Sequence, residues 1–226
     1  MADGLDAEEY DALVTAAETY RAALVVRLGG EAGLRTGEIT RVAPRHLREP
    51  ESDVDLAILA VPTDDAAGET ETVDDSETDA TVGDPSAIDR ETAIPTSLAA
   101  ELRRYAESAS LSDSEPFVDV SPRRVQMIVR ETAERAAGRT DGLAPDVTPR
   151  DLRRTFARRL LVDRGVDPHA VREAGGWETL ATLDGYLGPL DGEAIAEAVA
   201  GDLAGPSDGP AAGSSPTALG GFEALA

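Results

Sequence analysis

The sequence of 226 residues contains no cysteine, no lysine and only two histidines. Without cysteine there are no disulfides, thiolate metal sites or cysteine nucleophiles. Without lysine there is no Schiff-base chemistry, no lysine general acid and no P-loop lysine. With two histidines, a metal site would consist mostly of carboxylates, and no EF-hand spacing is present. We therefore expect neither a metal nor a cofactor.

Long apolar segments are also missing. No apolar run approaches the roughly 18 residues that suggest a membrane span. The N-terminal segment "MADGLDAEEY" lacks the basic residues and the apolar stretch of a signal peptide. The sequence therefore predicts a cytoplasmic protein without membrane contact.

The charge is strongly one-sided, with 44 acidic residues against 21 basic ones and a formal net charge of −23. Such acidity can mean that the protein repels nucleic acid. It can also mean a halophilic protein whose surface works in molar salt, where the Debye length is about 3 Å and distant charges barely act. We favour the halophilic interpretation, under which net charge says little about partners.

The charge is also uneven along the chain. Residues 63–89 hold ten acidic residues and no basic one, which predicts a solvated, flexible loop between two strands. Residues 121–172 hold twelve arginines against seven acidic residues, which indicates a site for a polyanion. The alternative is that these arginines pair with acidic residues on solvated helix faces.

Capping patterns and apolar spacing predict most elements. Helix starts are expected at Asp6 with Glu9, Ser121 with Pro122, Thr148 with Pro149 and Asp167 with Pro168. Helical spacing covers 7–20, 97–107, 122–137, 149–164 with a stop at Gly165, 168–175, a segment with Tyr186, and 191–203, whereas 54–61 and 90–95 are expected strands. The fold class is mainly α with a small antiparallel β-sheet (α+β). We expect one domain over residues 1–203, including the 63–89 loop, and a flexible low-complexity tail over 204–226.

Arginines stand out within three short motifs, "GLRTGE" (33–38), "TPRDLRRTFA" (148–157) and "GGWETLATLDGY" (175–186). Arg150 and Arg153 are three residues apart and should share a helix face roughly opposite the apolar stripe, so that both guanidinium groups point out of the core. The donor fork of arginine matches the oxygens of a phosphate.

In this order and spacing, the motifs resemble the catalytic domain of the tyrosine recombinases, the phage integrase family, over roughly residues 6–190. The family pattern has a "G-L-R-x-x-E" turn, an "H-x-L-R" box and a Tyr nine residues after a His or Trp. The resemblance implies that Arg35 and Arg153 clamp a scissile phosphate, that Arg150 contacts it, and that Trp177 packs or donates a hydrogen bond beside it. Tyr186 would attack phosphorus and form a 3′-phosphotyrosyl link, without metal or cofactor. We expect Tyr10, Tyr20 and Tyr105 in the core instead.

The resemblance also implies double-stranded DNA as the partner, with further contacts from Arg123, Arg124 and Arg130. Self-association, or a second recombinase on the DNA, would follow from the way family members assemble. The chain begins where the catalytic domain begins, so that we expect no core-binding domain before it.

Three departures concern activity. The family's catalytic lysine has no counterpart in a chain without lysine, and Arg90, at the start of the following strand, is a poor proton donor. Arg150 replaces the box histidine, and we expect His46 and His169 to be packing or surface residues. Leu183 replaces a frequent threonine, and Gly185 weakens the helix of the nucleophile. Three hypotheses remain: an active recombinase, a catalytically impaired DNA-binding accessory or regulatory protein of the same fold, and an acidic helical protein–protein interaction domain.

Overall fold

The computed structural model describes residues 4–62, 88–139 and 144–187. Its elements are α1 (Ala7–Thr15), α2 (Tyr20–Glu31), α3 (Thr36–Ile39), η1 (Pro44–His46), β1 (Leu47–Arg48), β2 (Leu56–Pro62), β3 (Ile88–Pro95), α4 (Thr96–Ala109), α5 (Pro122–Ala137), α6 (Pro149–Arg158), η3 (Arg159–Asp163), α7 (Pro168–Gly175), η4 (Leu180–Thr182) and α8 (Asp184–Leu187). The fold class is as predicted, mainly helical with a small antiparallel sheet. Most of the predicted acidic loop, the expected helix 191–203 and the tail 204–226 lie outside the described residues.

The predicted helix starts are confirmed by side-chain caps. Backbone N–H groups donate to the capping side chains of Asp6, Ser121, Thr148 and Asp167. One helix boundary was wrong: α1 ends at Thr15 and does not run to Tyr20. The reason is a second cap, because the Thr19 side chain accepts the N–H of Ala22 and starts α2 there.

Strand β2 lies in the middle of the sheet and pairs antiparallel with β1 and β3. Leu59 stands opposite Leu47 on one side and Thr92 on the other. The predicted loop ends too late, because Ile88 already pairs with Pro62 across a bulge and opens β3. Strand β1 was not predicted, since two residues are too short to show an alternating pattern.

The main core joins α1, α2, α4, α5, the first half of α6 and the sheet. Two glycines of α2 let neighbouring helices approach its backbone. A Cβ atom at Gly30 would lie 2.3 Å from Cε2 of Tyr10 in α1, and one at Gly29 would lie 2.9 Å from Cδ1 of Leu152 in α6. Helix α6 is therefore held directly against α2, next to the turn that carries Arg35.

The tyrosines expected in the core divide into two groups. Tyr10 is buried and hydrogen-bonded to Glu31, as a core position requires. Tyr20 is 42% exposed, so the prediction for it was wrong. As the first residue of α2 it lies at the surface, where its ring stacks on that of Tyr105 at 5.1 Å. Tyr105 is half-buried and packs against the main core, as predicted.

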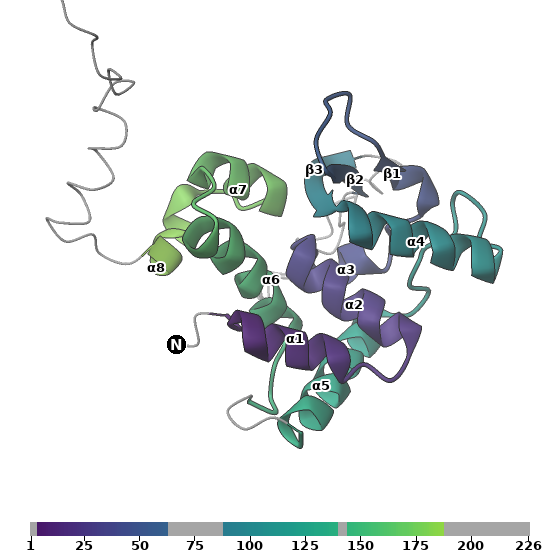
Figure 1. Ribbon diagram of the computed structural model, residues 1–226, viewed down its shortest axis with the longest axis horizontal. Helices are drawn as coiled ribbons and strands as arrows, with labels where there is room; N and C mark the ends of the chain where they lie inside the picture. The colour runs from purple at the N-terminus through teal and green to yellow at the C-terminus, as the bar shows by residue number, and fades with distance from the viewer. Residues whose placement is uncertain (1–3, 63–87, 140–143, 188–226) are drawn as a thin grey trace, which may run out of the picture. The chain divides into compact units, whose positions relative to one another are not determined.

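A second, smaller core cluster joins the end of α6 to α7 and α8. Its buried members are Ala157, Leu161, Val171 and Leu183, with Leu160, Val166, Trp177, Leu180 and Tyr186 packed against them. Figure 1 shows α7 and α8 beside α6 and away from α4 and α5. The cluster therefore places the two aromatic residues of the third motif beside α6.

Helix α6 passes into a π-helical turn, η3, before the chain reverses. Gly165 follows this turn and has a φ of +61°, in the left-handed region that favours glycine. This confirms the predicted stop. Isolated π-helical turns are often found at functional sites. This one faces α8, the helix that bears Tyr186.

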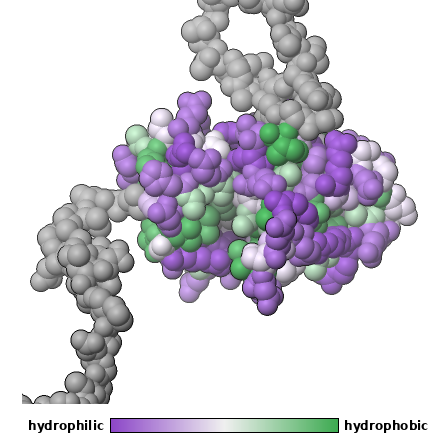
Figure 2. Space-filling model, turned by 90° about the horizontal axis from the view of Figure 1, so that it is seen from above, coloured by the Kyte–Doolittle hydropathy of each residue, from purple (hydrophilic) through white to green (hydrophobic). Residues whose placement is uncertain are grey.

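The surface is largely hydrophilic in the view of Figure 2, with scattered apolar patches. Within residues 4–62, 88–139 and 144–187, no helix has the length and apolarity that crossing a membrane requires.

Candidate active site

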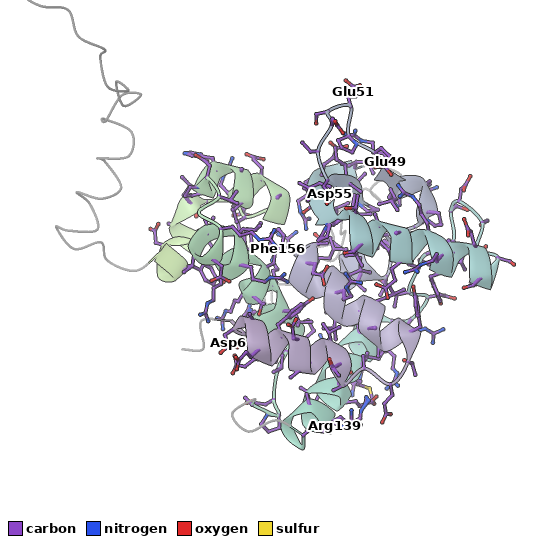
Figure 3. The ribbon with its side chains drawn as sticks, viewed as in Figure 1. Asp6, Glu49, Glu51, Asp55, Arg139 and Phe156 are labelled. Carbon is purple, nitrogen blue, oxygen red and sulfur yellow. The ribbon has the colours of Figure 1, made fainter. Side chains whose placement is uncertain are left out.

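The first motif forms a tight turn against α6. Gly33 has a φ of +66°, and a Cβ atom there would lie 2.6 Å from Cδ1 of Phe156. Only glycine satisfies both constraints. Phe156, labelled in Figure 3, thereby packs beside the start of α3, where Arg35 is the N-cap residue.

Glu38, three residues after Arg35, is fully buried in an ion-pair network. Its carboxylate accepts the Arg35 backbone N–H at 2.6 Å and the Arg35 side chain at 2.9 Å. Arg90 from β3 donates two further bonds, at 2.5 and 2.9 Å. Burial alone would raise the pKa of Glu38, but the bonds and charges of Arg90 and then Arg35 outweigh it and hold that pKa below its usual value.

The network extends to the C-terminal end of α7. Nε of Arg90 donates to the Ala174 carbonyl at 2.9 Å, and a terminal nitrogen of Arg35 donates to the Gly176 carbonyl at 2.6 Å. Gly176 has a φ of +64° and ends the helix. The first and third motifs are therefore joined by hydrogen bonds across 141 residues of sequence.

Arg153 of the second motif lies against both of these motifs. It donates to the Gly33 carbonyl at 2.5 Å, and its guanidinium carbon lies 4.3 Å from the centre of the Trp177 ring. Trp177 in turn stacks on Phe156, with ring centroids 6.3 Å apart. Arg153 is half-buried and lies outside both core clusters, as expected, but its guanidinium is held against the Gly33 turn and the indole ring. Arg150, one turn earlier, is exposed as expected.

Two guanidinium groups, those of Arg35 and Arg90, thus contact one buried carboxylate, and the charge of that carboxylate also acts on Arg153. Burial, followed by the charges of Arg35 and Arg90, lowers the pKa of Arg153 to about 9. A cation destabilised in this way gains from a nearby anion. The electrostatics therefore favour binding of a group such as phosphate.

Arg35 and Arg153 line a cleft of about 1230 Å³. Its lining includes all five residues predicted as catalytic, namely Arg35, Arg150, Arg153, Trp177 and Tyr186, together with Thr36, Gln126, Arg130, Glu134, Pro145, Asp146, Val147, Thr148, Pro149, Arg154 and Thr182. Sequence reasoning missed the contributions of Gln126, Arg154 and Thr182. Arg154 had a usable signal, since it directly follows Arg153.

Tyr186 is half-buried in α8, where it lines the cleft and packs on the second core cluster. Burial raises its pKa, an effect that the charge and hydrogen bond of Arg154 and the charge of Arg153 partly offset. Arg154 is itself paired with Asp151 at 3.3 Å. The phenol thus combines a core contact with an arginine-lined opening.

The three arginines predicted to contact DNA are not brought together. Arg130 lines the cleft and pairs with Glu134 at 3.0 Å. Arg124 pairs with Glu131 at 2.8 Å beside a smaller hollow, and Arg123 is exposed and lines neither. Arg124 points away from Arg123 because adjacent residues of a helix point about 100° apart.

Neither histidine belongs to the cleft. His46 is buried, and its Nδ1 accepts the N–H of Ala43 at 3.0 Å, whereas His169 is exposed at the start of α7. In the described part of the chain, no group of three or more His, Asp or Glu residues could hold a metal ion.

The architecture is that of the tyrosine-recombinase catalytic domain. Solved structures similar to this chain include the XerA recombinase (20% identity, TM-score 0.57, 88% of this chain), the Tn1549 transposon integrase in complex with transposon right end DNA (15%, 0.58, 89%) and a lambda integrase dimer bound to a COC' core site (18%, 0.51, 83%). The chain spans 65%, 66% and 61% of the lengths of these three proteins. A search of curated proteins found no significant match.

The sequence comparison with family models gives the same result. Residues 86–192 match the model described as the Phage integrase family. This segment includes the second and third motifs but not Arg35.

Proposed function

We propose that this chain is the catalytic part of a site-specific DNA recombinase or integrase. The observation that carries the proposal is the meeting of Arg35, Arg150, Arg153, Trp177 and Tyr186 at one cleft, although they come from three separate parts of the sequence. The similar structures of the Tn1549 and lambda integrases, which are bound to DNA, support double-stranded DNA as the substrate. The dimer of lambda integrase supports self-association on DNA.

The cleft suits attack by a phenol on a phosphodiester. The Tyr186 oxygen forms a bond to phosphorus and loses its proton, while the bond between phosphorus and the 5′-oxygen breaks. The product is a 3′-phosphotyrosyl link and a 5′-hydroxyl group, which takes up one proton. Arg35 and Arg153 donate to the non-bridging oxygens and stabilise the charge that grows in the transition state. Arg150 adds a further contact at the cleft.

Covalent trapping tests this proposal. The full chain is mixed in molar KCl with labelled genomic DNA of its source organism, denatured in detergent, and assayed for DNA linked to protein. We expect an adduct that disappears in Tyr186→Phe and falls in Arg153→Ala. Tyr20→Phe is the matched control, because Tyr20 is exposed and does not line the cleft.

A second candidate is a DNA-binding accessory protein of the same fold that does not cut. The observation that favours it is the absence of lysine from the whole sequence and of histidine from the residues lining the cleft. General acid–base assistance contributes about 10² to 10⁴ in rate, and its loss can abolish useful chemistry. DNA binding that survives Tyr186→Phe and falls in Arg153→Ala, without any adduct, would establish this function. A chain without DNA affinity at any salt concentration would contradict both candidates and favour a protein–protein interaction domain.

A further inference from the structure

Arg90 does not line the cleft, yet it contacts both segments that hold the cleft's first and third motifs. Its side chain is only 6% exposed. It leaves β3 and ends between the carboxylate of Glu38 and the last turn of α7. The polar contacts of Arg90 within the described residues are with Glu38, Asp89, Gly33 and Ala174.

The contact with Glu38 is bidentate and directed. Two terminal nitrogens of Arg90 meet the two carboxylate oxygens of Glu38, whose side chain is 1% exposed. The same carboxylate holds Arg35 through its backbone and its side chain. Arg90 and Arg35 therefore share the buried carboxylate of Glu38, and the other ion pair of Arg90, with Asp89 at 3.7 Å, is longer.

The contact with α7 is equally specific. Nε of Arg90 donates to Ala174, three residues before Trp177. A Cβ atom at residue 176 would lie 2.8 Å from Cδ of Arg90, so that Gly176 leaves the space that Arg90 occupies. Beyond this glycine the chain turns, and the Trp177 ring folds back over Gly175.

We propose that Arg90 is a positioning residue that holds Arg35 and Trp177 in fixed places relative to each other at the edge of the cleft. The inference rests on the proposed phosphate site. Without Arg90, Arg35 is the one side chain of the described residues that still donates to the buried carboxylate of Glu38. Its partly exposed guanidinium is then drawn inward, since an uncompensated buried charge is costly. The end of α7 also loses a donor, so that Trp177 is less firmly placed beside Arg153.

Trp177 is the only tryptophan of the chain, so its emission reports on this edge of the cleft. The full chain is titrated with inorganic phosphate at constant KCl concentration, as wild type, Arg90→Met and Arg48→Met. Arg48 is the matched control, because it forms an Arg–Glu pair on the same sheet with a side chain that is 48% exposed. We expect Arg90→Met to change the emission and to weaken phosphate binding by about tenfold or more. Arg48→Met should leave both unchanged.

A second variant guards against unfolding. Arg90→Lys keeps a positive charge beside Glu38 but loses the bidentate contact and the Nε donor to Ala174, and it should still weaken phosphate binding. Folding is followed by circular dichroism. A folded variant of either kind with wild-type phosphate affinity and emission would show that Arg90 only stabilises the fold, and the inference would be wrong. A wild-type chain that does not bind phosphate would contradict the proposed function as well, which separates the two failures.

Discussion

The guanidinium carbon of Arg153 lies 4.3 Å from the centre of the Trp177 ring, although the two residues come from different motifs. The same guanidinium donates to the Gly33 carbonyl of the first motif. Arg153 belongs to the second motif and contacts both the first and the third. Its planar guanidinium is suited to this role because it can stack on a ring and donate a hydrogen bond at the same time.

Replacing this fork tests its role. Arg153→Lys keeps the charge but loses the planar stacking and the second donor, and we expect DNA adduct formation to fall by about 10²- to 10³-fold. Arg158→Lys, on the same helix but not lining the cleft, should have little effect. Equal rates for the two variants in a quantitative trapping assay would contradict the assigned role.

Two glycines near Trp177 offer a matched pair. A Cβ atom at Gly175 would lie 1.8 Å from Cζ3 of Trp177, whereas nothing lies within 4 Å of one at Gly185. Gly175→Ala should displace the indole from Arg153, change the emission of Trp177 and weaken phosphate binding. Gly185→Ala should leave the emission unchanged and stabilise α8, since alanine favours helix by up to about 1 kcal/mol over glycine. The same emission change in both variants would argue against a steric cause.

The reactivity of Tyr186 should depend on Arg154. The charge and hydrogen bond of Arg154 lower the pKa of the phenol against the effect of burial, so that Arg154→Met should raise this pKa further. The measurement is ultraviolet titration of the phenolate, with the Tyr186→Phe spectrum subtracted. Arg158→Met is the control. A Tyr186 titration curve unchanged by Arg154→Met would show that the contact has no electrostatic role.

The pH dependence of stability should contain a contribution from Glu38. The pKa of Glu38 in the folded chain is below the ordinary value of 4.5, so the folded state takes up this proton at a lower pH than the unfolded state does. The stabilisation is complete above about pH 4.5 and is lost as the pH falls through the lower, folded pKa. The difference in unfolding free energy between wild type and Glu38→Gln should therefore shrink in that acidic window. Glu91→Gln, which removes an exposed partner of Arg48, should show a much smaller change.

Salt should stabilise the fold. Formal charges sum to −23, and their repulsion is screened over about 3 Å in molar salt but reaches about 10 Å at 0.1 M. The thermal unfolding midpoint should rise steadily between 0.1 and about 2 M KCl if the surface is of the halophilic type. An unchanged midpoint over this range would count against that interpretation.

The sequence by itself determined most of the helix starts and five of the residues that line the cleft. Caps such as Thr148 and Asp167 mark helix starts because their hydrogen bonds are made within one turn, and they were read correctly. The motif order also selected Arg35, Arg150, Arg153, Trp177 and Tyr186, which share one cleft. Capping patterns and helical spacing do not predict a contact whose two residues are far apart in the sequence.

Only the tertiary structure decided the direction and environment of these side chains. The Arg153 guanidinium contacts the Gly33 carbonyl and the Trp177 ring, and neither contact can be read from the spacing of α6. Arg90 lies in β3, as the sequence predicted, but only its bonds to Glu38 and Ala174 show that it connects the first and third motifs. The physical reason is that burial and ion pairing depend on contacts between distant segments, whereas caps and helical periods depend on neighbours.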